Sequence, residues 1–390
     1  MNLSTYNKIS KEDSRFFDVL RGFSAYLVVL AHVYQMMFQP FFESTLINKV
    51  VYTVAQYAVI VFFVLSGFMI SNSIYRNLSS NGFCSFNIKD FVLNRLLRLY
   101  PPLIFSVLVV TLVYFVVTFF GIPFSNGHEI FLVRESFEYN VVDIFASLIF
   151  LQNISTDVFL TPSMNGPLWS LSYEFWYYIL TALIVFSLLH NKMLLSLPVA
   201  FFMFVLFFGK WFLFFGGFFS WGLGFLYLVL YQNIERFSIR KWGVDVVILL
   251  FSSIVLYCLI FSRSEILTFG SRYLFSICFV LVLIRLKLFN SLSVKIFIGN
   301  PVCVFFANSS QFSYTLYIIH WPLLMLYYSL VSDLISFNLQ CVIAFSFLFV
   351  ILITMVSYNC SRFLEDKNYV RRVMGDVVGR FGVLMSGKRI

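Results

Sequence analysis

Charged residues are scarce in this chain. Aspartate, glutamate, lysine and arginine together account for 12% of its 390 residues, whereas hydrophobic residues account for 60%. In soluble globular proteins about a quarter of the residues are charged. The composition therefore excludes a soluble globular protein and indicates an integral membrane protein.

The cysteines lack any pattern that binds metals or builds a disulfide framework. The chain has six, scattered and mostly within apolar runs, with no C-x-x-C pair. They are Cys84, Cys258, Cys278, Cys303, Cys341 and Cys360. Neither a disulfide framework nor a zinc site is indicated, and no other cluster of ligands points to a metal. We expect these cysteines to be small core residues.

The sequence also has no Walker A loop, no glycine-rich dinucleotide turn and no alternation of aromatic and basic residues outside the apolar runs. These absences argue against nucleotide hydrolysis and against a nucleic-acid partner. A cleavable signal peptide is not indicated either. The first apolar run is long and lacks the small-residue exit of such a peptide, so we expect it to remain as a helix.

Ten apolar windows are long enough to cross a bilayer as helices, which takes about twenty residues each. They predict an all-α fold, a polytopic bundle of ten transmembrane helices. The apolar stretch 141–151 is too short to span and is expected at the interface. The predicted spans are 16–39, 50–73, 103–121, 169–189, 193–209, 211–231, 243–262, 268–284, 312–333 and 337–358.

The lysines and arginines predict the orientation of these spans. If the amino terminus is inside, most of the 27 fall on the inner side and five on the outer side. Because basic residues favour the cytoplasmic side, both termini are predicted to be cytoplasmic. The chain then divides into a tail over 1–15, a transmembrane domain over 16–358 and a basic tail over 359–390. The five outer residues are Lys49, Arg134, Lys210, Arg263 and Arg272.

The longest predicted outer loop, about 122–168, carries five acidic residues and the single arginine Arg134. Two interpretations stay open for it. The loop either caps a cleft that opens outwards, or it is a solvated connection without a role.

The first predicted span contains three ionisable residues, Asp18, Arg21 and His32. An ionisable side chain inside a bilayer costs a few kcal/mol and by default marks a functional site facing the protein interior. At 100° per residue, Arg21 and His32 lie within about 20° of one helix face and about 16 Å apart along the axis. Asp18 shares that face. The span therefore predicts a polar stripe directed into the bundle.

This stripe belongs to the first of five motifs that occur in order along the chain. Together the motifs resemble the acyltransferase-3 family, multi-pass membrane enzymes that O-acylate sugars and surface polysaccharides such as O-antigens. They are FDVLRGFSAYLVVLAH at 17–32, FFVLSGFMIS at 62–71, RLLRLYPP at 95–102, GPLWSLSYEFWYY at 166–178 and SYTLYIIHWPLL at 313–324.

The resemblance implies a ten-helix core, acetyl-CoA or another acyl-CoA as co-substrate, and a glycan or lipid-linked sugar as acceptor. It also implies a place in the cell inner membrane, in contact with membrane lipids. Some members add a C-terminal hydrolase-like domain, which we do not expect here. The acceptor sugar, the acyl chain and the oligomeric state, a homo-oligomer included, stay open.

His32 is the predicted catalytic base. Acyl transfer from a thioester to an alcohol needs a group that takes the hydroxyl proton, and histidine is the commonest choice. The alternative is a buried histidine satisfied by a helix carbonyl; the resemblance, in which the matching histidine is essential, favours catalysis. Glu174 is predicted at similar depth and is expected to orient His32 as the third group of a triad does. Its alternative is a solvated carboxylate at the outer interface.

Three arginines are predicted to bind the phosphates of the acyl donor. Arg95 and Arg98 share a helical face, and a guanidinium matches phosphate oxygens in a bidentate manner. The alternative for these two is positive-inside anchoring of a helix next to the membrane. Arg21 is expected to bind the donor as well, unless it forms a structural ion pair with Asp18 three residues earlier.

The remaining candidates are supporting residues. Ser172 and Tyr173 are predicted to contact the acceptor sugar, although such residues at helix ends usually cap or anchor. His320, next to Pro322, is expected to line the same passage, with a second catalytic role or a structural one. Ser66 and Gly67 are expected to permit close helix packing; an acyl-enzyme on the serine is a minor alternative.

A rival hypothesis from another class is a glycan flippase, transporter or polymerase. In that case His32, Glu174 and His320 would line a substrate path, because intramembrane ionisable residues fit both classes. The arginines Arg21, Arg95 and Arg98 distinguish the enzyme from the flippase, since a flippase has no evident need of a coenzyme site. An inactive scaffold of the same fold is a third alternative, against which the intact motifs argue.

Overall fold

The computed structural model describes residues 9–42, 45–122, 138–153, 159–190, 211–233, 241–261, 265–289, 299–335, 338–366 and 368–373. Within these ranges the regular structure is helical and contains no strand. The predicted all-α fold is confirmed.

The described chain contains long helices and short helical segments. The long helices are α1 (Lys11–Val33), α2 (Thr45–Ser80), α3 (Ile88–Phe120), α5 (Trp169–Leu189), α7 (Trp211–Asn233), α8 (Lys241–Phe261), α9 (Glu265–Phe289), α12 (Ser313–Ile335) and α13 (Leu339–Leu364). The short ones are the π-helix η1 (Tyr34–Phe38), the 3₁₀ helices η2 (Gln39–Phe41) and η3 (Ser163–Leu168), α4 (Val141–Leu148) and α11 (Pro301–Ser309).

Eight helical segments of the described residues are long and apolar enough to cross a membrane, and they lie over eight of the ten predicted spans. α9 forms a helix over the predicted span 268–284 but is not one of the eight. The predicted span 193–209 lies outside the described residues. The stretch 141–151 contains only α4, eight residues long, which agrees with its being too short to span.

One predicted boundary is wrong. The sequence predicts the third span over 103–121, directly after Pro101 and Pro102, but α3 begins at Ile88 and runs through both prolines. Its amino end is capped by Asn87, whose side chain accepts a hydrogen bond from the amide of Asp90. Since proline has no amide hydrogen, two carbonyls of the preceding turn lose their helical partners, which the helix tolerates. The arginines of RLLRLYPP therefore lie on the membrane helix itself.

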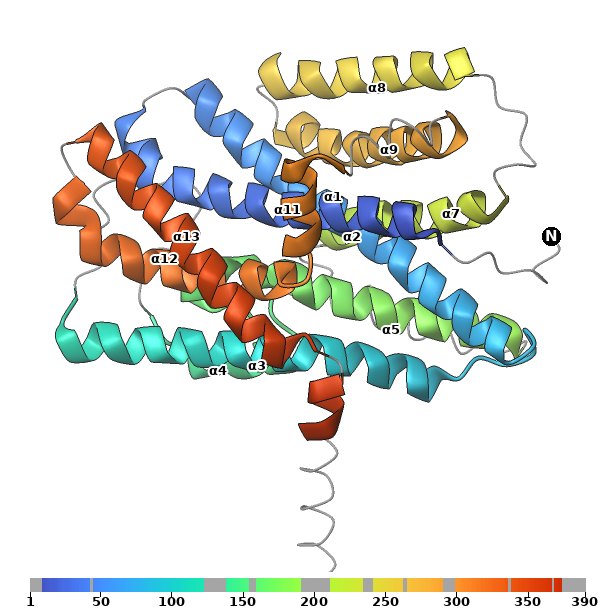
Figure 1. Ribbon diagram of the computed structural model, residues 1–390, viewed down its shortest axis with the longest axis horizontal. Helices are drawn as coiled ribbons and strands as arrows, with labels where there is room; N and C mark the ends of the chain where they lie inside the picture. Colours follow the sequence, from blue (N-terminus) through green and yellow to red (C-terminus); the bar gives the residue numbers. More distant parts are fainter. Residues whose placement is uncertain are drawn as a thin grey trace, which may run out of the picture.

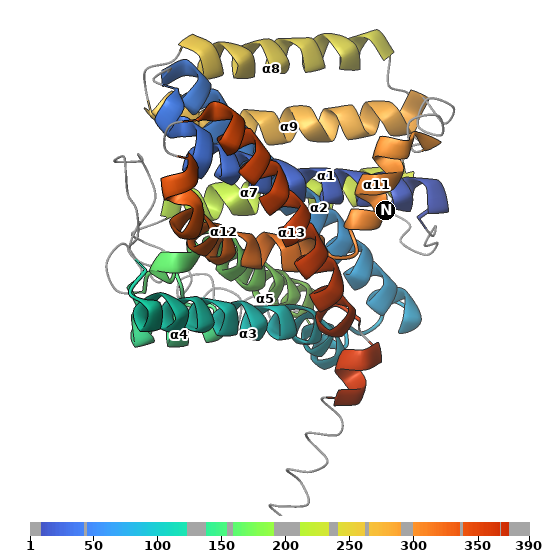
Figure 2. The same ribbon diagram turned by 60° about the vertical axis from the view of Figure 1, so that its left-hand side comes forward.

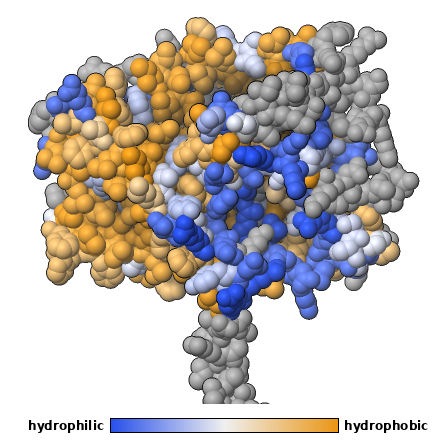
Figure 3. Space-filling model, in the orientation of Figure 1, coloured by the Kyte–Doolittle hydropathy of each residue, from blue (hydrophilic) through white to orange (hydrophobic). Residues whose placement is uncertain are grey.

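The helices form a layered bundle with α1 and α2 near its centre (Figure 1). α8 lies along one edge with only 11% of its apolar window buried, against 72% for α2. α3 and α4 lie on the opposite side, and the short α11 crosses α1 steeply; both views agree on this arrangement (Figure 2). In Figure 3 the hydrophilic side chains gather on the right of the visible face, beside α11 and the end of α13, whereas apolar side chains cover its left.

α2 and α7 touch backbone to backbone. A Cβ atom added to Gly67 would lie 1.9 Å from the carbonyl oxygen of Trp221, and one added to Gly224 would lie 1.9 Å from that of Val64. Small residues allow such close approach of helices in membranes. The expected packing role of Gly67 is confirmed, and the contact fixes how Ser66 faces its neighbours.

The η3 segment is attached deep in the bundle because α12 contains a proline. In a regular helix the carbonyl of Ile318 would accept from the amide of residue 322, but Pro322 has none. The buried side chain of Asn165 in η3 donates to this oxygen instead, with an Nδ2 to O distance of 2.8 Å. Ser106 of α3 donates to it as well, at 3.0 Å. The amino end of α5 is therefore held inside the bundle beside α12.

We predict that Gly224→Ala destabilises the bundle, because its new methyl group would overlap the backbone of α2. Overpacking of this kind costs about 1–3 kcal/mol. The measurement is the thermal unfolding midpoint of the purified protein in detergent. Gly222→Ala is the matched control, since a Cβ atom at Gly222 of the same helix meets no atom within 4 Å. Equal midpoints for the two variants would contradict the packing argument.

Candidate functional site

A cavity of about 490 Å³ lies among α1, α2, α3, α5 and α12. Four arginines and three acidic residues line it, so its charge is net positive and favours an anionic ligand. These seven are Asp18, Arg21, Arg76, Arg95, Arg98, Glu174 and Glu365. All three predicted donor-binding arginines are thus brought together, although Arg21 and Arg98 are 77 positions apart in the sequence.

Arg21 forms the ion pair with Asp18 that the sequence posed as an alternative, with an Nη2 to Oδ1 distance of 2.8 Å. Both side chains nevertheless line the cavity. The Nε atom of Arg21 is buried and has no hydrogen-bond partner among the described residues. The ion pair therefore orients the guanidinium at the cavity wall and leaves it donors for a ligand.

Arg95 and Arg98 differ in their contacts. Arg95 donates to the hydroxyl of Ser73 at 3.2 Å and lies over the ring of Phe91. Arg98 interacts electrostatically with the carboxylates of Glu174 and Glu365. In the described part of the chain its guanidinium makes no hydrogen bond to protein. Arg98 is thus a cation held in the wall with its donors unused.

Glu174 lies beside these arginines and not beside His32. Its Oε1 accepts hydrogen bonds from the hydroxyl of Ser66, at 2.5 Å, and from that of Tyr178. The indole of Trp221 donates in turn to the Ser66 hydroxyl at 3.3 Å. The predicted pairing of Glu174 with His32 is therefore wrong.

The position of η3 explains this correction. The prediction placed Trp169 at the outer surface, but η3 holds the start of α5 within the bundle, where Ser170 is hydrogen-bonded to Tyr317 at 2.8 Å. Glu174, further along α5, interacts electrostatically with Tyr314. Tyr314 and His320 are six residues apart on α12, about 9 Å along the helix axis. Glu174 and His32 therefore lie at different depths.

His32 is paired with His320. Their Nδ1 and Nε2 atoms are 2.7 Å apart, and the two ring planes are nearly parallel at 8°. His320 is completely buried, and its Nδ1 lies 2.7 Å from the carbonyl oxygen of Tyr317. His32 is partly exposed, so it is the accessible member of the pair. The π-helix η1 begins two residues after it, and π turns are frequent at functional sites.

Tyr317 separates the cavity from this histidine pair. Its side chain lines the cavity, and its hydroxyl donates to the carbonyl of Pro167 at 3.1 Å. Its own carbonyl contacts His320, one helical turn further along α12. The arginine cavity and the histidine pair thus lie on either side of Tyr317.

The other two predicted residues face away from the cavity. The Ser172 hydroxyl donates to the carbonyl of Phe150 at 3.0 Å, and the Tyr173 hydroxyl contacts Asn153. Both are completely buried, and neither lines the cavity. They attach the segment 138–153 to α5, so the structure gives them a packing role.

Sequence reasoning missed Glu365. Its Oε1 accepts from the amide and the hydroxyl of Thr315, at 2.9 and 2.6 Å, near the amino end of α12. Burial raises the pKa of this carboxyl, while Thr315, Arg98 and Arg21 oppose the shift. Glu365 belongs to the stretch predicted as a basic tail. Its acidic side chain among basic residues was the only feature of the sequence that could have drawn attention to it.

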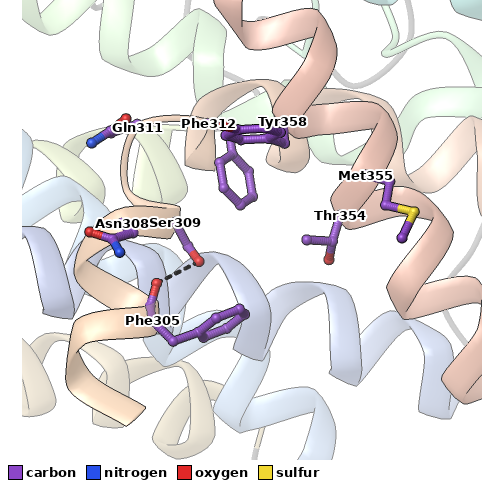
Figure 4. A pocket seen from close by; sticks show the side chains of 8 residues that line it. All are labelled: Phe305, Asn308, Ser309, Gln311, Phe312, Thr354, Met355 and Tyr358. Carbon is purple, nitrogen blue, oxygen red and sulfur yellow. Dashed lines mark hydrogen bonds between the residues drawn. The ribbon is translucent and has the colours of Figure 1, made fainter. Parts of the chain in front are cut away.

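A second hollow, of about 410 Å³, lies between α11 and α13. Figure 4 shows Phe305 and Ser309 of α11 on one side of it, and Thr354 and Met355 of α13 on the other. Its described lining contains no charged side chain and none of the predicted site residues. The candidate site is therefore the arginine cavity together with the histidine pair.

Comparisons with known proteins identify the family of this chain. A family model described as an acyltransferase domain matches residues 14–359. An O-acetyl transferase of Shigella phage Sf6 is 29% identical over 197 residues, which is 48% of this chain and 51% of the phage protein. The chain thus spans about half the length of that relative. No solved structure matches. Because the family model covers most of the chain, including every residue of the histidine pair and the three predicted arginines, the chain belongs to the acyltransferase-3 family.

Proposed function

We propose that this protein is a membrane O-acyltransferase that moves an acetyl group from acetyl-CoA to a hydroxyl of a cell-surface glycan. The glycan is an O-antigen, an exopolysaccharide or its lipid-linked precursor. The observation that carries the proposal is a cavity with four arginines whose wall, at Tyr317, is one helical turn from a hydrogen-bonded histidine pair. Family membership and the phage relative support it.

The arginine end of the cavity is suited to the phosphates of the coenzyme. Coenzyme A carries a diphosphate and a 3′-phosphate, and guanidinium groups bind such oxygens with charge-assisted hydrogen bonds. Arg98 has its donors unused, and Arg21 and Arg95 each keep a buried Nε without a partner among the described residues. The acids Asp18, Glu174 and Glu365 hold the guanidiniums in place before the donor binds.

The histidine end supplies the base. His32 takes the proton of the acceptor hydroxyl as the oxygen attacks the thioester carbonyl, so that a new ester C–O bond forms. The C–S bond then breaks, and the proton on His32 passes to the departing thiolate to give free coenzyme A. The imidazole returns to its neutral form after each transfer, as a general acid and base does.

The separation of the two ends suggests how the substrates approach. The arginines lie on the side predicted to be cytoplasmic, where acetyl-CoA is available, and the histidine pair lies deeper along α1 and α12. The pantetheine arm would reach past Tyr317 towards His32, and the acceptor would arrive from the outer side. This arrangement fits an enzyme of the inner membrane that modifies a glycan before or during its export.

We predict that His32→Ala abolishes acylation of the surface glycan, because the neighbouring imidazole of His320 is completely buried and cannot replace it. Mass spectrometry of the glycan, with and without the gene, should find one acetyl increment that disappears in the variant. His190→Ala is the control, since His190 is exposed and its ring is hydrogen-bonded to the Phe186 carbonyl of its own helix. Unchanged acetylation in a His32→Ala protein that still inserts normally would defeat the proposal and favour a transporter.

We also predict that Arg98→Ala weakens the binding of coenzyme A by about 10- to 100-fold, because hydrogen bonds to charged groups contribute about 1.5–3 kcal/mol. The measurement is calorimetric titration of coenzyme A into the purified protein in nanodiscs. The matched control is Arg362→Ala, an exposed arginine of α13 whose guanidinium contacts Tyr358 of the same helix. Equal affinities for the two variants would rule out phosphate binding at Arg98.

A further inference from the structure

We propose that His320 is a positioning residue that fixes the tautomer of His32, so that Nε2 of His32 is the atom that takes the acceptor proton. The inference deepens the proposed function, on which its catalytic part rests. It assigns to a second histidine the orienting role that a carboxylate has in most His-based sites.

The protonation of His320, the buried member of the pair, follows from its contact with a backbone carbonyl. A carbonyl oxygen can only accept a hydrogen bond, so the contact between the Tyr317 carbonyl and Nδ1 of His320 requires a proton on that nitrogen. In a neutral imidazole one ring nitrogen is a donor and the other an acceptor. Nε2 of His320 therefore carries no proton and accepts a hydrogen bond.

The hydrogen bond between the two histidines then determines the tautomer of His32. Because Nε2 of His320 is an acceptor, the atom 2.7 Å away, Nδ1 of His32, must donate to it. His32 then carries its proton on Nδ1, and its lone pair is on Nε2. Among the described residues no protein group is hydrogen-bonded to that nitrogen. The free lone pair thus belongs to the partly exposed histidine.

The opposite assignment is unfavourable in this environment. A proton on Nε2 of His320 would leave the bare Nδ1 facing a carbonyl oxygen, two acceptors 2.7 Å apart. His320 is completely buried, and an unsatisfied polar group in such a place costs about 1–3 kcal/mol. The fixed direction of the Tyr317 carbonyl therefore determines both tautomers.

Packing keeps the two rings in this geometry. The ring of Trp321 lies 4.8 Å from that of His32 at an angle of 69°, which hinders rotation of the imidazole. On α12 the carbonyl freed by Pro322 is held by Asn165 and Ser106, so the helix that carries His320 is attached to α3 and η3. When His32 takes the acceptor proton at Nε2, it keeps its Nδ1 proton, and His320 stabilises the imidazolium through the same hydrogen bond.

The direct test is nitrogen NMR on the full chain in nanodiscs, with 15N-labelled histidine and no substrate. The chain has four histidines, so the double variant His128→Gln, His190→Gln leaves only the pair. We expect both rings to be protonated at Nδ1 and bare at Nε2. A His32 ring protonated at Nε2 and bare at Nδ1 would overturn the assignment, whatever the activity of the protein.

A kinetic test addresses the positioning role. His320→Ala should lower the kcat of acetyl transfer to the host glycan by about 10²- to 10⁴-fold. His320→Gln keeps an acceptor for Nδ1 of His32 and should retain kcat within about tenfold of the wild type. The KM for acetyl-CoA should stay within about twofold in both variants, because the arginine cavity is separate from the pair.

The outcomes separate this inference from the proposed function. Equal losses of kcat in His320→Ala and His320→Gln, with coenzyme A binding intact, would overturn the positioning role. Loss of coenzyme A binding in both variants would also overturn it, since His320 would then act on the fold as a whole. If the wild type transfers no acetyl group, the proposed function fails, while the NMR result still decides the tautomer.

Discussion

The hydrogen bond from Asn165 to the carbonyl of Ile318 sets the depth at which the parts of the site meet. Inside a bilayer no water can satisfy a free carbonyl, so a proline in a membrane helix requires a donor from a neighbouring element. Pro322 creates that requirement on α12, and η3 meets it. The start of α5 is consequently held beside Tyr317, which places Glu174 with the arginines and leaves His32 to pair with His320.

The site that results keeps two kinds of polar group apart. Guanidinium and carboxylate groups share the cavity, where Arg21 is paired with Asp18 and Arg98 interacts with nearby carboxylates. The histidines lie beyond Tyr317, where they are hydrogen-bonded to each other and to the carbonyl of Tyr317. Because an isolated charge is costly in an apolar interior, this division keeps the charged groups together and away from the histidines.

Much of the site was predictable, because in a helix the spacing of residues along the sequence determines which side chains share a face. Arg21 and His32 lie on one face of α1, and Arg95 and Arg98 are one turn apart on α3, so periodicity and position placed them correctly in the cavity or beside it. The sequence failed at Glu174, where depth was counted from a surface that α5 does not reach. It also failed at Glu365, which approaches Arg98 from α13 across a large distance in sequence.

The sequence by itself determined that this is a helical membrane protein of the acyltransferase-3 family, and it predicted several of the polar residues that the bundle brings together, among them Arg21, Arg95 and Arg98. Composition and helical period are local properties, so they can be read along the chain. Only the tertiary structure decided the partners: His320 for His32, Ser66 for Glu174, and Thr315 for Glu365. The physical reason is that each of these contacts depends on the relative depth of two helices. That depth is set by hydrogen bonds between distant segments, which no spacing within one helix encodes.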